Sequence, residues 1–410
     1  MRKFIVSVVV ALLVVCGSRF YVYKANNVSE TYENKETLNN NLLSMMLETS
    51  AGSGEYQETT ASAWPTEGYV FNESLSKCEQ GSNLSWDNVN KKVIMKGSRA
   101  DKCFVYFDVK PPEYLAEHIK SLYTTQGVNN LYLHDSTLTN GAGDNSYRYA
   151  GSSETTNNFV CFGYDSTDGT CPTDYLYRII GVFDGKVKLI KYDYATSDLL
   201  GTDGEYYKTY KANFETYGGE SKGNNLTSSL GCYYWNNSRG FNSWGESQMN
   251  TINLNKNYIN YISERWASKI LIYKWIIGGN SRVNLKLNTS EVYQNEIISP
   301  MTNTTYSTKI ALIYASDYGF AASPNAWLTK LSSYSVSSIT ETNWMYMGLY
   351  EHLLTKLSDS TEEILSISKS GDVEKEFVSD CEAIRPTFYL NSDVTYISGK
   401  GTKTEPFIID

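Results

Sequence analysis

The stretch LYRIIGVFDGKVKLIKYDY at positions 176–194 decides the fold, because it is the clearest β-hairpin in the chain. Two runs rich in β-branched and aromatic residues flank Asp184-Gly185, a dipeptide that tolerates the positive φ angles of a two-residue turn. One apolar face of the pair can be supplied by Ile180, Val182, Val187 and Leu189. We therefore predict an antiparallel hairpin with that face toward a core.

Short strands and a few helices are expected on both sides of this hairpin. Upstream, residues 84–108 read as a β-meander, 111–127 as a helix, and 130–134 and 146–150 as strands. Downstream, apolar residues at helical spacing over 259–270 predict a helix with Trp266 in the core, 310–322 reads as a strand running into a loop, and 366–377 as a hairpin. The expected fold class is α+β, with short antiparallel strands and long loops.

Composition divides the 410 residues into four segments. Residues 1–23 are apolar, and 24–64 are rich in Asn, Glu, Ser, Thr and Gly, which predicts a flexible stalk apart from one helix over 36–47. Residues 65–157 are expected to form a small β-rich domain with one helix, and residues 158–410 the α+β domain.

The N-terminal segment MRKFIVSVVVALLVVCGSRFYVY indicates export. Arg2 and Lys3 precede an apolar run that is shorter than the roughly 20 residues of a full membrane span. Three interpretations remain: a cleaved signal peptide, an uncleaved anchor extended to Tyr23, and a lipoprotein modified at Cys16. Each of them exports the chain, and we expect any attachment to the bacterial membrane to run only through this segment, as an anchor or a lipid at Cys16.

The cysteines agree with an extracellular location. Besides Cys16 the chain has six, an even number that indicates disulfides in an exported protein. Proximity in sequence favours Cys78–Cys103 and Cys161–Cys171, which leaves Cys232–Cys381. No C-x-x-C or Cys/His pattern with zinc spacing occurs.

Net charge and aromatic content limit the partners. The net charge is −9 without a long basic run, so we expect no nucleic-acid partner. The chain has 34 Tyr and 8 Trp against 3 His. Tyrosine has a flat apolar face and a polar tip, which suits contact with sugars or proteins, and it is also favoured in strands. Both interpretations of the tyrosines stay open.

The loop HDSTLTNGAGDNSYRYAG at 134–151 raises the question of a metal site. Its candidate ligand oxygens belong to Asp135, Asn140, Asp144 and Asn145. Several oxygens on one loop could converge on calcium, although the alternating register of an EF-hand is missing. Asn and Gly also tolerate positive φ, so the other interpretation is a polar turn at the edge of a ligand site, with no cofactor.

Five short motifs resemble a family of exported surface proteins of unknown function from low-GC Gram-positive gut bacteria. They are the segments 177–182 (YRIIGV), 244–247 (WGES), 314–319 (YASDYG), 344–348 (WMYMG) and 384–390 (IRPTFYL). The resemblance covers most of the mature chain. It brings no functional residue, because no chemistry is established for that family.

The C-terminal part also resembles C-type-lectin-like domains, including the formylglycine-generating-enzyme branch. This resemblance implies a C-type-lectin-like domain whose loops after residue 196 and around 323–343 form a ligand face. The sequence departs from the sugar-binding motifs of those lectins, since only Trp235-Asn236-Asn237 is similar to their Trp-Asn-Asp. His352 stands where members of the surface-protein family carry an aromatic residue.

These features predict a non-catalytic domain at the cell surface that recognises a glycan or a protein. Aromatic faces would stack on sugar rings and amides would bind hydroxyls. The expected contacts are Tyr233, Tyr234, Trp235, Asn236, Trp327 and Trp344. The alternative is a structural subunit of a pilus-like or cell-wall assembly. The motif H-E-x-x-H is absent from the sequence, and a catalytic interpretation would need a carboxylate pair drawn from Asp317, Glu351, Glu362 and Asp372.

Overall fold

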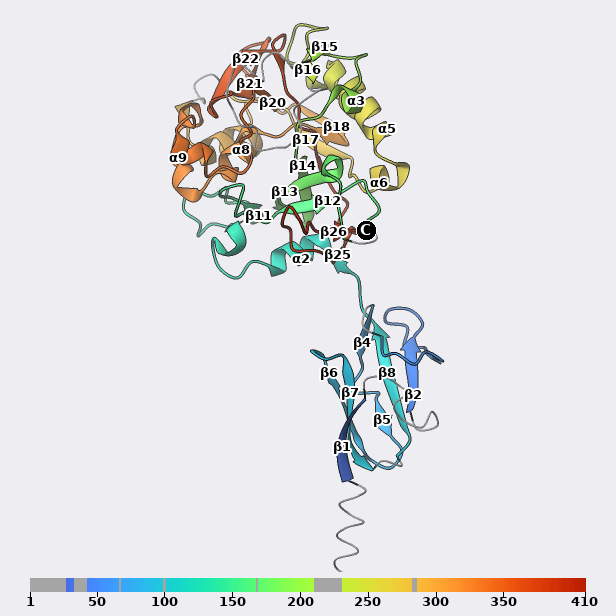
Figure 1. Cartoon of the computed structure of the whole chain (residues 1–410). Coiled ribbons are helices and arrows are strands. Elements are labelled where there is room, and N and C mark those ends of the chain that lie inside the picture. The colour runs from blue at the N-terminus through green and yellow to red at the C-terminus, as the bar shows by residue number, and fades with distance from the viewer. Residues whose placement is uncertain are drawn as a thin grey trace, which may run out of the picture. The chain divides into compact units, whose positions relative to one another are not determined.

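The structure is a computed structural model that describes residues 27–32, 43–65, 68–98, 101–166, 169–209, 231–281 and 286–410. Its backbone contacts divide the chain into two units, Met1–Pro112 and Glu113–Asp410 (Figure 1). Residues 1–23, on which the export prediction depends, lie outside the described residues. Among the helices of the described segments, none combines the length and the apolar character needed to cross a membrane.

The first unit consists of two small sheets in the residues described. Its strands are β1 (Asn27–Tyr32), β2 (Leu43–Glu48), β3 (Tyr56–Glu58), β4 (Tyr69–Phe71), β5 (Lys77–Cys78), β6 (Asn83–Asp87), β7 (Lys92–Ser98) and β8 (Cys103–Val109). One sheet has the order β1-β7-β6 and the other β3-β2-β8-β4, with β5 also paired to β8. Cys103, Val105 and Phe107 alternate on the buried face of β8.

Three predictions for this region need correction. Residues 24–64 are not a stalk throughout, because β2 pairs with β8 in parallel and β3 pairs with β2. The expected helix 36–47 is a strand from Leu43 onward. The expected meander is also only half correct, since β6 and β7 form a hairpin but β8 belongs to the other sheet. These pairings join segments far apart in sequence, which local composition does not reveal.

The second unit is built on a seven-stranded sheet. Its order is β10-β11-β13-β14-β24-β19, and β12 pairs with β13. The strands are β10 (Leu131–His134), β11 (Ser146–Tyr149), β12 (Phe159–Cys161), β13 (Leu176–Phe183), β14 (Lys186–Lys191), β19 (Ile310–Ala311) and β24 (Thr387–Tyr389). The division at residues 112 and 113 corrects the expected break at 157, because Leu115 and Ile119 of helix α2 (Leu115–Ser121) belong to the core of this unit.

The predicted hairpin 176–194 is confirmed as strands β13 and β14. Asp184 and Gly185 both have positive φ, at 48° and 72°, as a two-residue turn of this type requires. Gly181 lies at a register shift of β13, where a Cβ atom would meet the carbonyl oxygen of Tyr147 at 2.2 Å. The glycine therefore allows β11 to approach β13 and brings Arg148 opposite Gly181.

Smaller sheets surround the main one in the second unit. They contain β9 (Glu113–Tyr114), β15 (Tyr206–Thr209), β16 (Gly231–Tyr234), β17 (Tyr273–Ile276), β18 (Thr305–Thr308), β20 (Glu351–Lys356), β21 (Glu363–Ile367), β22 (Val373–Phe377), β23 (Cys381–Glu382), β25 (Thr395–Ser398) and β26 (Ile408–Ile409). Their orders are β15-β16-β23, β17-β18, β20-β21-β22 and β26-β25-β9. The hairpin predicted over 366–377 corresponds to β21 and β22.

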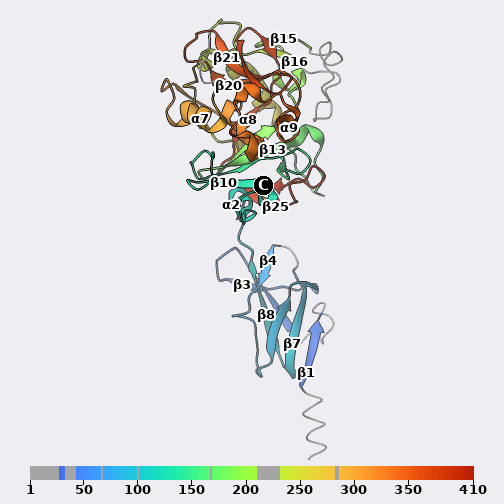
Figure 2. The same ribbon diagram turned by 90° about the vertical axis from the view of Figure 1, so that its left-hand side faces the viewer.

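Short helices complete this unit. The α-helices after α2 are α3 (Ser197–Leu200), α5 (Ile259–Tyr261), α6 (Glu264–Ser268), α7 (Thr289–Tyr293), α8 (Ala315–Ala321) and α9 (Ser337–Thr340). Two π-helical segments, η5 and η7, span Met249–Tyr258 and Gln294–Ile298; 3-10 turns include Val128–Asn130, Thr173–Tyr175, Trp244–Glu246, Pro324–Ala326 and Leu331–Ser333. Figures 1 and 2 both show α8 close to β20 and β21.

Two helix predictions differ from the structure. The single helix expected over 259–270 is interrupted between α5 and α6, where Ile262 adopts an extended conformation, although Trp266 is buried as predicted. The loop expected after the strand at 310 is helix α8 instead, with every residue buried. A helix that is covered on all sides has no amphipathic stripe, so its periodicity is not visible in the sequence.

The three predicted disulfides are confirmed. Cys78–Cys103 joins β5 to β8 in the first unit, and Cys161–Cys171 and Cys232–Cys381 lie in the second. The last of these connects β16 to β23, which are also paired as strands although they are separated by 149 residues in sequence. The coarse prediction of a mixed fold with many short antiparallel strands and a few helices agrees with the structure.

Candidate functional site

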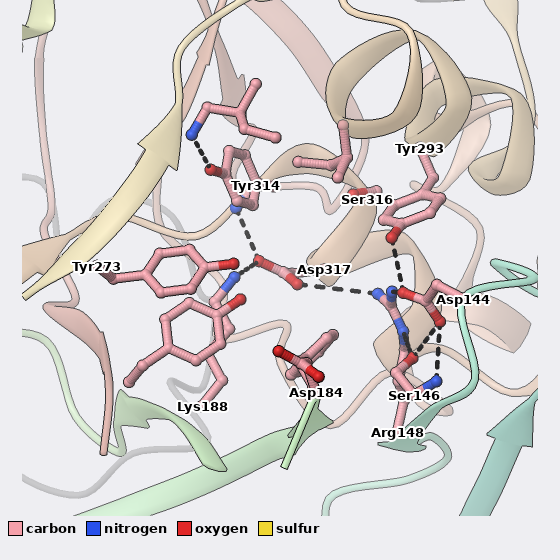
Figure 3. A pocket seen from close by; sticks show the side chains of 14 residues that line it. Asp144, Ser146, Arg148, Asp184, Lys188, Tyr273, Tyr293, Tyr314, Ser316 and Asp317 are labelled. Atoms are coloured by element: carbon pink, nitrogen blue, oxygen red, sulfur yellow. Dashed lines mark hydrogen bonds and ion pairs between the residues drawn. The ribbon is translucent and has the colours of Figure 1, made fainter. Parts of the chain in front are cut away.

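A cavity of about 190 Å³ lies over the four inner strands of the main sheet (Figure 3). Four neighbouring strands bring residues to it: Arg148 from β11, Phe183 from β13, Lys188 from β14 and Tyr389 from β24. The other walls come from β17, from α7 with η7, and from α8. They contribute Tyr273, Ile276, Tyr293, Ile297, Ser316 and Asp317. Because rigid elements supply most of the walls, the cavity is formed before any ligand arrives.

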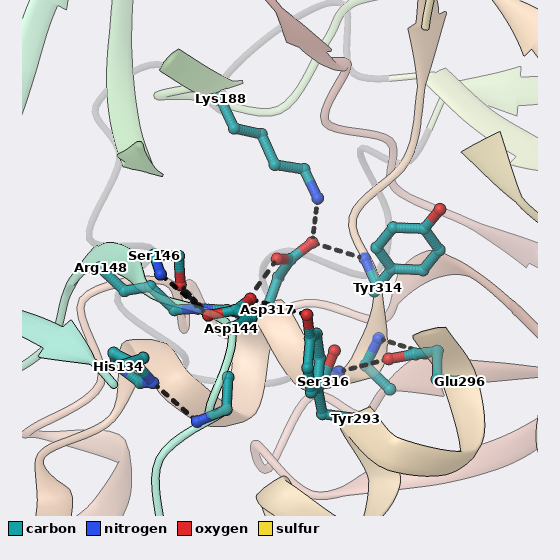
Figure 4. A network of polar contacts seen from close by, with 12 residues as sticks. His134, Asp144, Ser146, Arg148, Lys188, Tyr293, Glu296, Tyr314, Ser316 and Asp317 are labelled. Atoms are coloured by element: carbon teal, nitrogen blue, oxygen red, sulfur yellow. Dashed lines mark hydrogen bonds and ion pairs between the residues drawn. The ribbon is translucent and has the colours of Figure 1, made fainter. Parts of the chain in front are cut away.

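Lys188 and Asp317 form a buried ion pair at the bottom of the site (Figure 4). The Lys188 ammonium donates to Asp317 Oδ2 at 2.5 Å, and the two side chains are 1% and 3% exposed. The same carboxylate oxygen accepts from the Tyr314 backbone N–H at 3.0 Å, so Asp317 also caps helix α8. Burial lowers the pKa of Lys188, and the charge of Asp317 offsets part of that effect.

Aromatic rings enclose the Lys188 ammonium. The Nζ atom lies 4.7 Å from the ring centre of Tyr314, 5.3 Å from that of Tyr389 and 5.4 Å from that of Trp275. Tyr273 stacks on Tyr389 with ring centres 4.0 Å apart. Cations are attracted to ring faces, so these contacts hold the charge in place where water is largely excluded.

Arg148 and Asp144 form a second pair beside the first. Arg148 Nη2 donates to Asp144 Oδ2 at 2.6 Å, and its Nε donates to the Ser146 hydroxyl at 2.8 Å. The Tyr293 hydroxyl donates to the same oxygen of Asp144 at 2.6 Å. Burial alone raises the pKa of the Asp144 carboxyl, but the Arg148 charge and the hydroxyls of Ser146 and Tyr293 hold that pKa well below its usual range.

The two pairs approach each other across the site. Arg148 Nη1 lies 4.0 Å from Asp317 Oδ1, so two cations and two carboxylates form one cluster whose charges sum to zero. Behind the cluster, Glu296 accepts from the backbone N–H groups of Ala315 and Ser316, each at 3.1 Å, and from the Thr355 hydroxyl. These bonds fix the first turn of α8 and therefore the position of Asp317.

The loop 134–151 contributes Asp144 to this site from near its C-terminal end. Asp144 pairs with Arg148, whereas Asp135 accepts from the N–H and hydroxyl of Thr137. Asn140 and Asn145 have φ of 59°, which fits the turn interpretation. Among the residues that the structure describes, no group of His, Cys, Asp and Glu is arranged to hold a metal ion.

The aromatic residues expected to contact a ligand lie elsewhere. Tyr233, Trp235, Asn236, Trp327 and Trp344 are buried, with 2% exposure or less, and Tyr234 is half-buried. The three indole N–H groups donate to backbone oxygens of Leu353, Ala322 and Tyr149, respectively. These side chains therefore fill cores and are spread over several elements, which corrects the expectation that together they form an open ligand face.

The sequence carries only an indirect signal for the residues that form the cavity. Of its lining residues, only Asp144, as a metal candidate, and Asp317, in a possible carboxylate pair, are named from the sequence. Arg148 lies in SYRY and Lys188 in KVKLIK, both in segments predicted as strands. A charged side chain within a buried strand needs a partner of opposite charge. The two cations, together with Asp317 of YASDYG, therefore indicate buried ion pairs. Of the metal candidates in the loop, Asp144 alone lines the cavity.

A group of carboxylates lies near the Cys232–Cys381 disulfide, on β22, β23 and the turn between them. Burial, a hydrogen bond with Asp380 and the charge of Glu382 raise the pKa of Glu376 to about 8. Glu382 itself lies 2.9 Å from His352, measured between Oε2 and Nδ1. Carboxyls held this close share protons, so the group responds to pH.

Glu376→Gln is expected to raise the melting temperature at pH 8 and to leave it nearly unchanged at pH 4. An unfolded glutamate has a pKa of about 4.3. With the folded pKa raised to about 8, the stabilising contribution of the protonated carboxyl is complete below pH 4 and is lost as pH rises toward 8. Gln stays neutral and still donates to Asp380. Thermal melts of both proteins test this, with the exposed Glu341→Gln as control; an equal shift at both pH values would contradict it.

Known proteins supply no function for this chain. A scan against protein-family models, a search of curated proteins and a search of solved structures each found no match to it. A function is therefore inferred from the cavity alone, where two buried ion pairs present hydrogen-bond donors and acceptors side by side within an aromatic enclosure.

Proposed function

We propose that the protein is a non-catalytic recognition domain, lectin-like in its second unit, that binds one sugar residue in the cavity at the bacterial cell surface. The observation that carries this proposal is the neutral cluster of Arg148, Asp144, Lys188 and Asp317 within aromatic walls. Location outside the cell, with attachment through the N-terminal segment, is part of the same proposal. The three disulfides support it, because such bonds persist in oxidising compartments.

A sugar matches the chemistry of the cluster. Each sugar hydroxyl both donates and accepts hydrogen bonds, and the site offers carboxylate acceptors beside ammonium, guanidinium and phenol donors. Because the four charges cancel, a neutral ligand adds no unpaired charge to a partly buried site. Ile276, Ile297 and Phe183 supply apolar surface for the carbon face of the ring.

The size of the cavity limits the ligand. Sites for drug-sized molecules occupy roughly 300–1,000 Å³, and this cavity occupies about 190 Å³. It therefore suits one ring, such as the terminal unit of a glycan, and not a longer segment. Figure 3 shows the Tyr273 hydroxyl directed toward the Lys188–Asp317 pair, where it can contact such a ring.

Tyr273→Phe is expected to weaken binding of the recognised monosaccharide about five- to tenfold. The change removes one hydroxyl, whose hydrogen bond is worth about 1 to 1.5 kcal/mol, and keeps the ring that stacks on Tyr389. Isothermal titration with a panel of hexoses, N-acetylhexosamines, uronic acids and sialic acid identifies the sugar and measures the change.

Tyr164→Phe is the matched control, because Tyr164 is 38% exposed and does not line the cavity. It should bind the sugar as the unmodified protein does. Equal affinity in the Tyr273→Phe and Tyr164→Phe proteins would contradict the assigned site. No binding by any sugar of the panel would contradict the function itself.

A further inference from the structure

A second and larger hollow of about 490 Å³ lies away from the cavity. It is lined by Phe241 and Trp244, by Thr304, Thr305 and Tyr306 at β18, and by Lys356 at the end of β20. Its volume falls within the range of sites that hold ligands of several rings. We refer to this hollow as the groove.

One wall of the groove contains a buried donor with no acceptor among the described residues. Trp244 is 1% exposed, and its indole N–H has no hydrogen-bond partner there. Its ring packs against Trp235 with centres 5.0 Å apart, so the indole is fixed in place. The indole nitrogen itself is inaccessible from the groove, so Trp244 contributes a fixed aromatic wall.

The wall that carries this donor is held rigidly. The Asn242 amide donates to the backbone oxygens of Leu357, Ser360 and Glu363, and the Asn236 amide donates to that of Phe241 at 2.6 Å. Phe241 is nevertheless 37% exposed. An exposed ring on a fixed backbone, beside threonine hydroxyls, offers stacking and hydrogen bonding together.

The groove and the cavity are separate. Adjacent residues of one segment line them, Ile276 the cavity and Ile277 the groove, and successive side chains of an extended chain point in opposite directions. None of the residues that line the groove lines the cavity. A ligand in one therefore leaves the contacts of the other unchanged.

We propose that the groove is a second carbohydrate site, which takes several consecutive units of a neutral sugar chain. Phe241 and Tyr306 stack on sugar rings, and Thr304, Thr305 and Lys356 contact hydroxyls. The choice of a sugar as ligand rests on the function proposed for the cavity. The assignment of the groove rests on its own aromatic and hydroxyl-bearing walls.

Phe241→Ala is expected to weaken the binding of a tetrasaccharide about tenfold without changing the binding of a monosaccharide. The probes are linear tetrasaccharides of glucose, mannose, galactose and N-acetylglucosamine with the matching monosaccharides, titrated into the full chain. Thr305→Val, which removes the hydroxyl of an exposed residue, is expected to weaken the binding of the tetrasaccharide about threefold. Leu328→Ala truncates a side chain that is 63% exposed and does not line the groove, and it should change neither affinity. The tetrasaccharide should also shift the indole proton resonance of Trp244.

The outcomes separate this inference from the proposed function. If tetrasaccharides bind no more tightly than monosaccharides and Phe241→Ala has no effect, the groove assignment is overturned while the cavity stands. If tetrasaccharides bind and respond to Phe241→Ala but no monosaccharide binds, the groove is supported and the cavity proposal fails. If no sugar of either length binds, both proposals are overturned.

Discussion

Asp317→Ala is expected to lower the free energy of unfolding by about 3–5 kcal/mol, because it leaves a buried cation unpaired. Lys188 is 1% exposed, and Asp317 is the carboxylate to which it donates. The same change removes the acceptor of the Tyr314 N–H at the start of α8. Urea denaturation of the full chain, followed by tryptophan fluorescence, measures the loss.

Two matched variants show whether the unpaired charge is the cause. Asp184→Asn changes a carboxylate that borders the same cavity but is 98% exposed, so its effect should stay within about 0.5 kcal/mol. Adding Lys188→Met to Asp317→Ala removes the buried charge and should restore at least half of the loss. A loss below about 1 kcal/mol for Asp317→Ala, or no recovery in the double variant, would contradict the buried-pair account.

Replacing Cys232 and Cys381 together by Ala is expected to lower the free energy of unfolding by about 5 kcal/mol. In the chain-entropy model, a cross-link stabilises by restricting the unfolded chain, and more strongly for a longer loop. This disulfide closes a separation of 149 residues, whereas Cys161–Cys171 closes 10. Removal of the shorter link should therefore cost less, about 3 kcal/mol.

Urea midpoints of the two double variants and the unmodified protein test this order. The longer link also packs against a small core of Tyr194, Met347, Leu349 and Ala383. Removing Cys232 and Cys381 should therefore expose that core and increase the binding of a hydrophobic dye. Equal destabilisation by the two double variants would contradict the loop argument. Six free thiols in the native protein would show that the three disulfides do not form, and the loop argument would then not apply.

The elements that were predictable from sequence are those with strong local signals. The Asp184-Gly185 turn, the alternation of Cys103, Val105 and Phe107 and the burial of Trp266 each depend on neighbouring residues. The pairing of β2 with β8 does not depend on neighbouring residues. It joins residues about 60 positions apart, and their strands have no shared sequence signal. Helix α8 is not predictable from local sequence either, because a helix that is buried on every side has no amphipathic pattern.

The cavity was less predictable than the fold. Its charged residues come from β11, β14, α8 and the loop before β11, and their distances depend on tertiary packing. Trp235 and Trp344 are predicted from the sequence to contact a ligand, because aromatic side chains often serve that role. Large aromatic side chains also fill cores, and a single sequence does not distinguish the two uses.

A crystal structure of the full chain with the monosaccharide that binds best tests the central claim most directly. We predict that one sugar ring lies in the cavity, with hydroxyls within hydrogen-bond distance of Asp317 or Lys188 and of the Tyr273 hydroxyl, and with its apolar face toward Ile276 or Ile297. A sugar bound at another surface, with only solvent in the cavity, would contradict the claim.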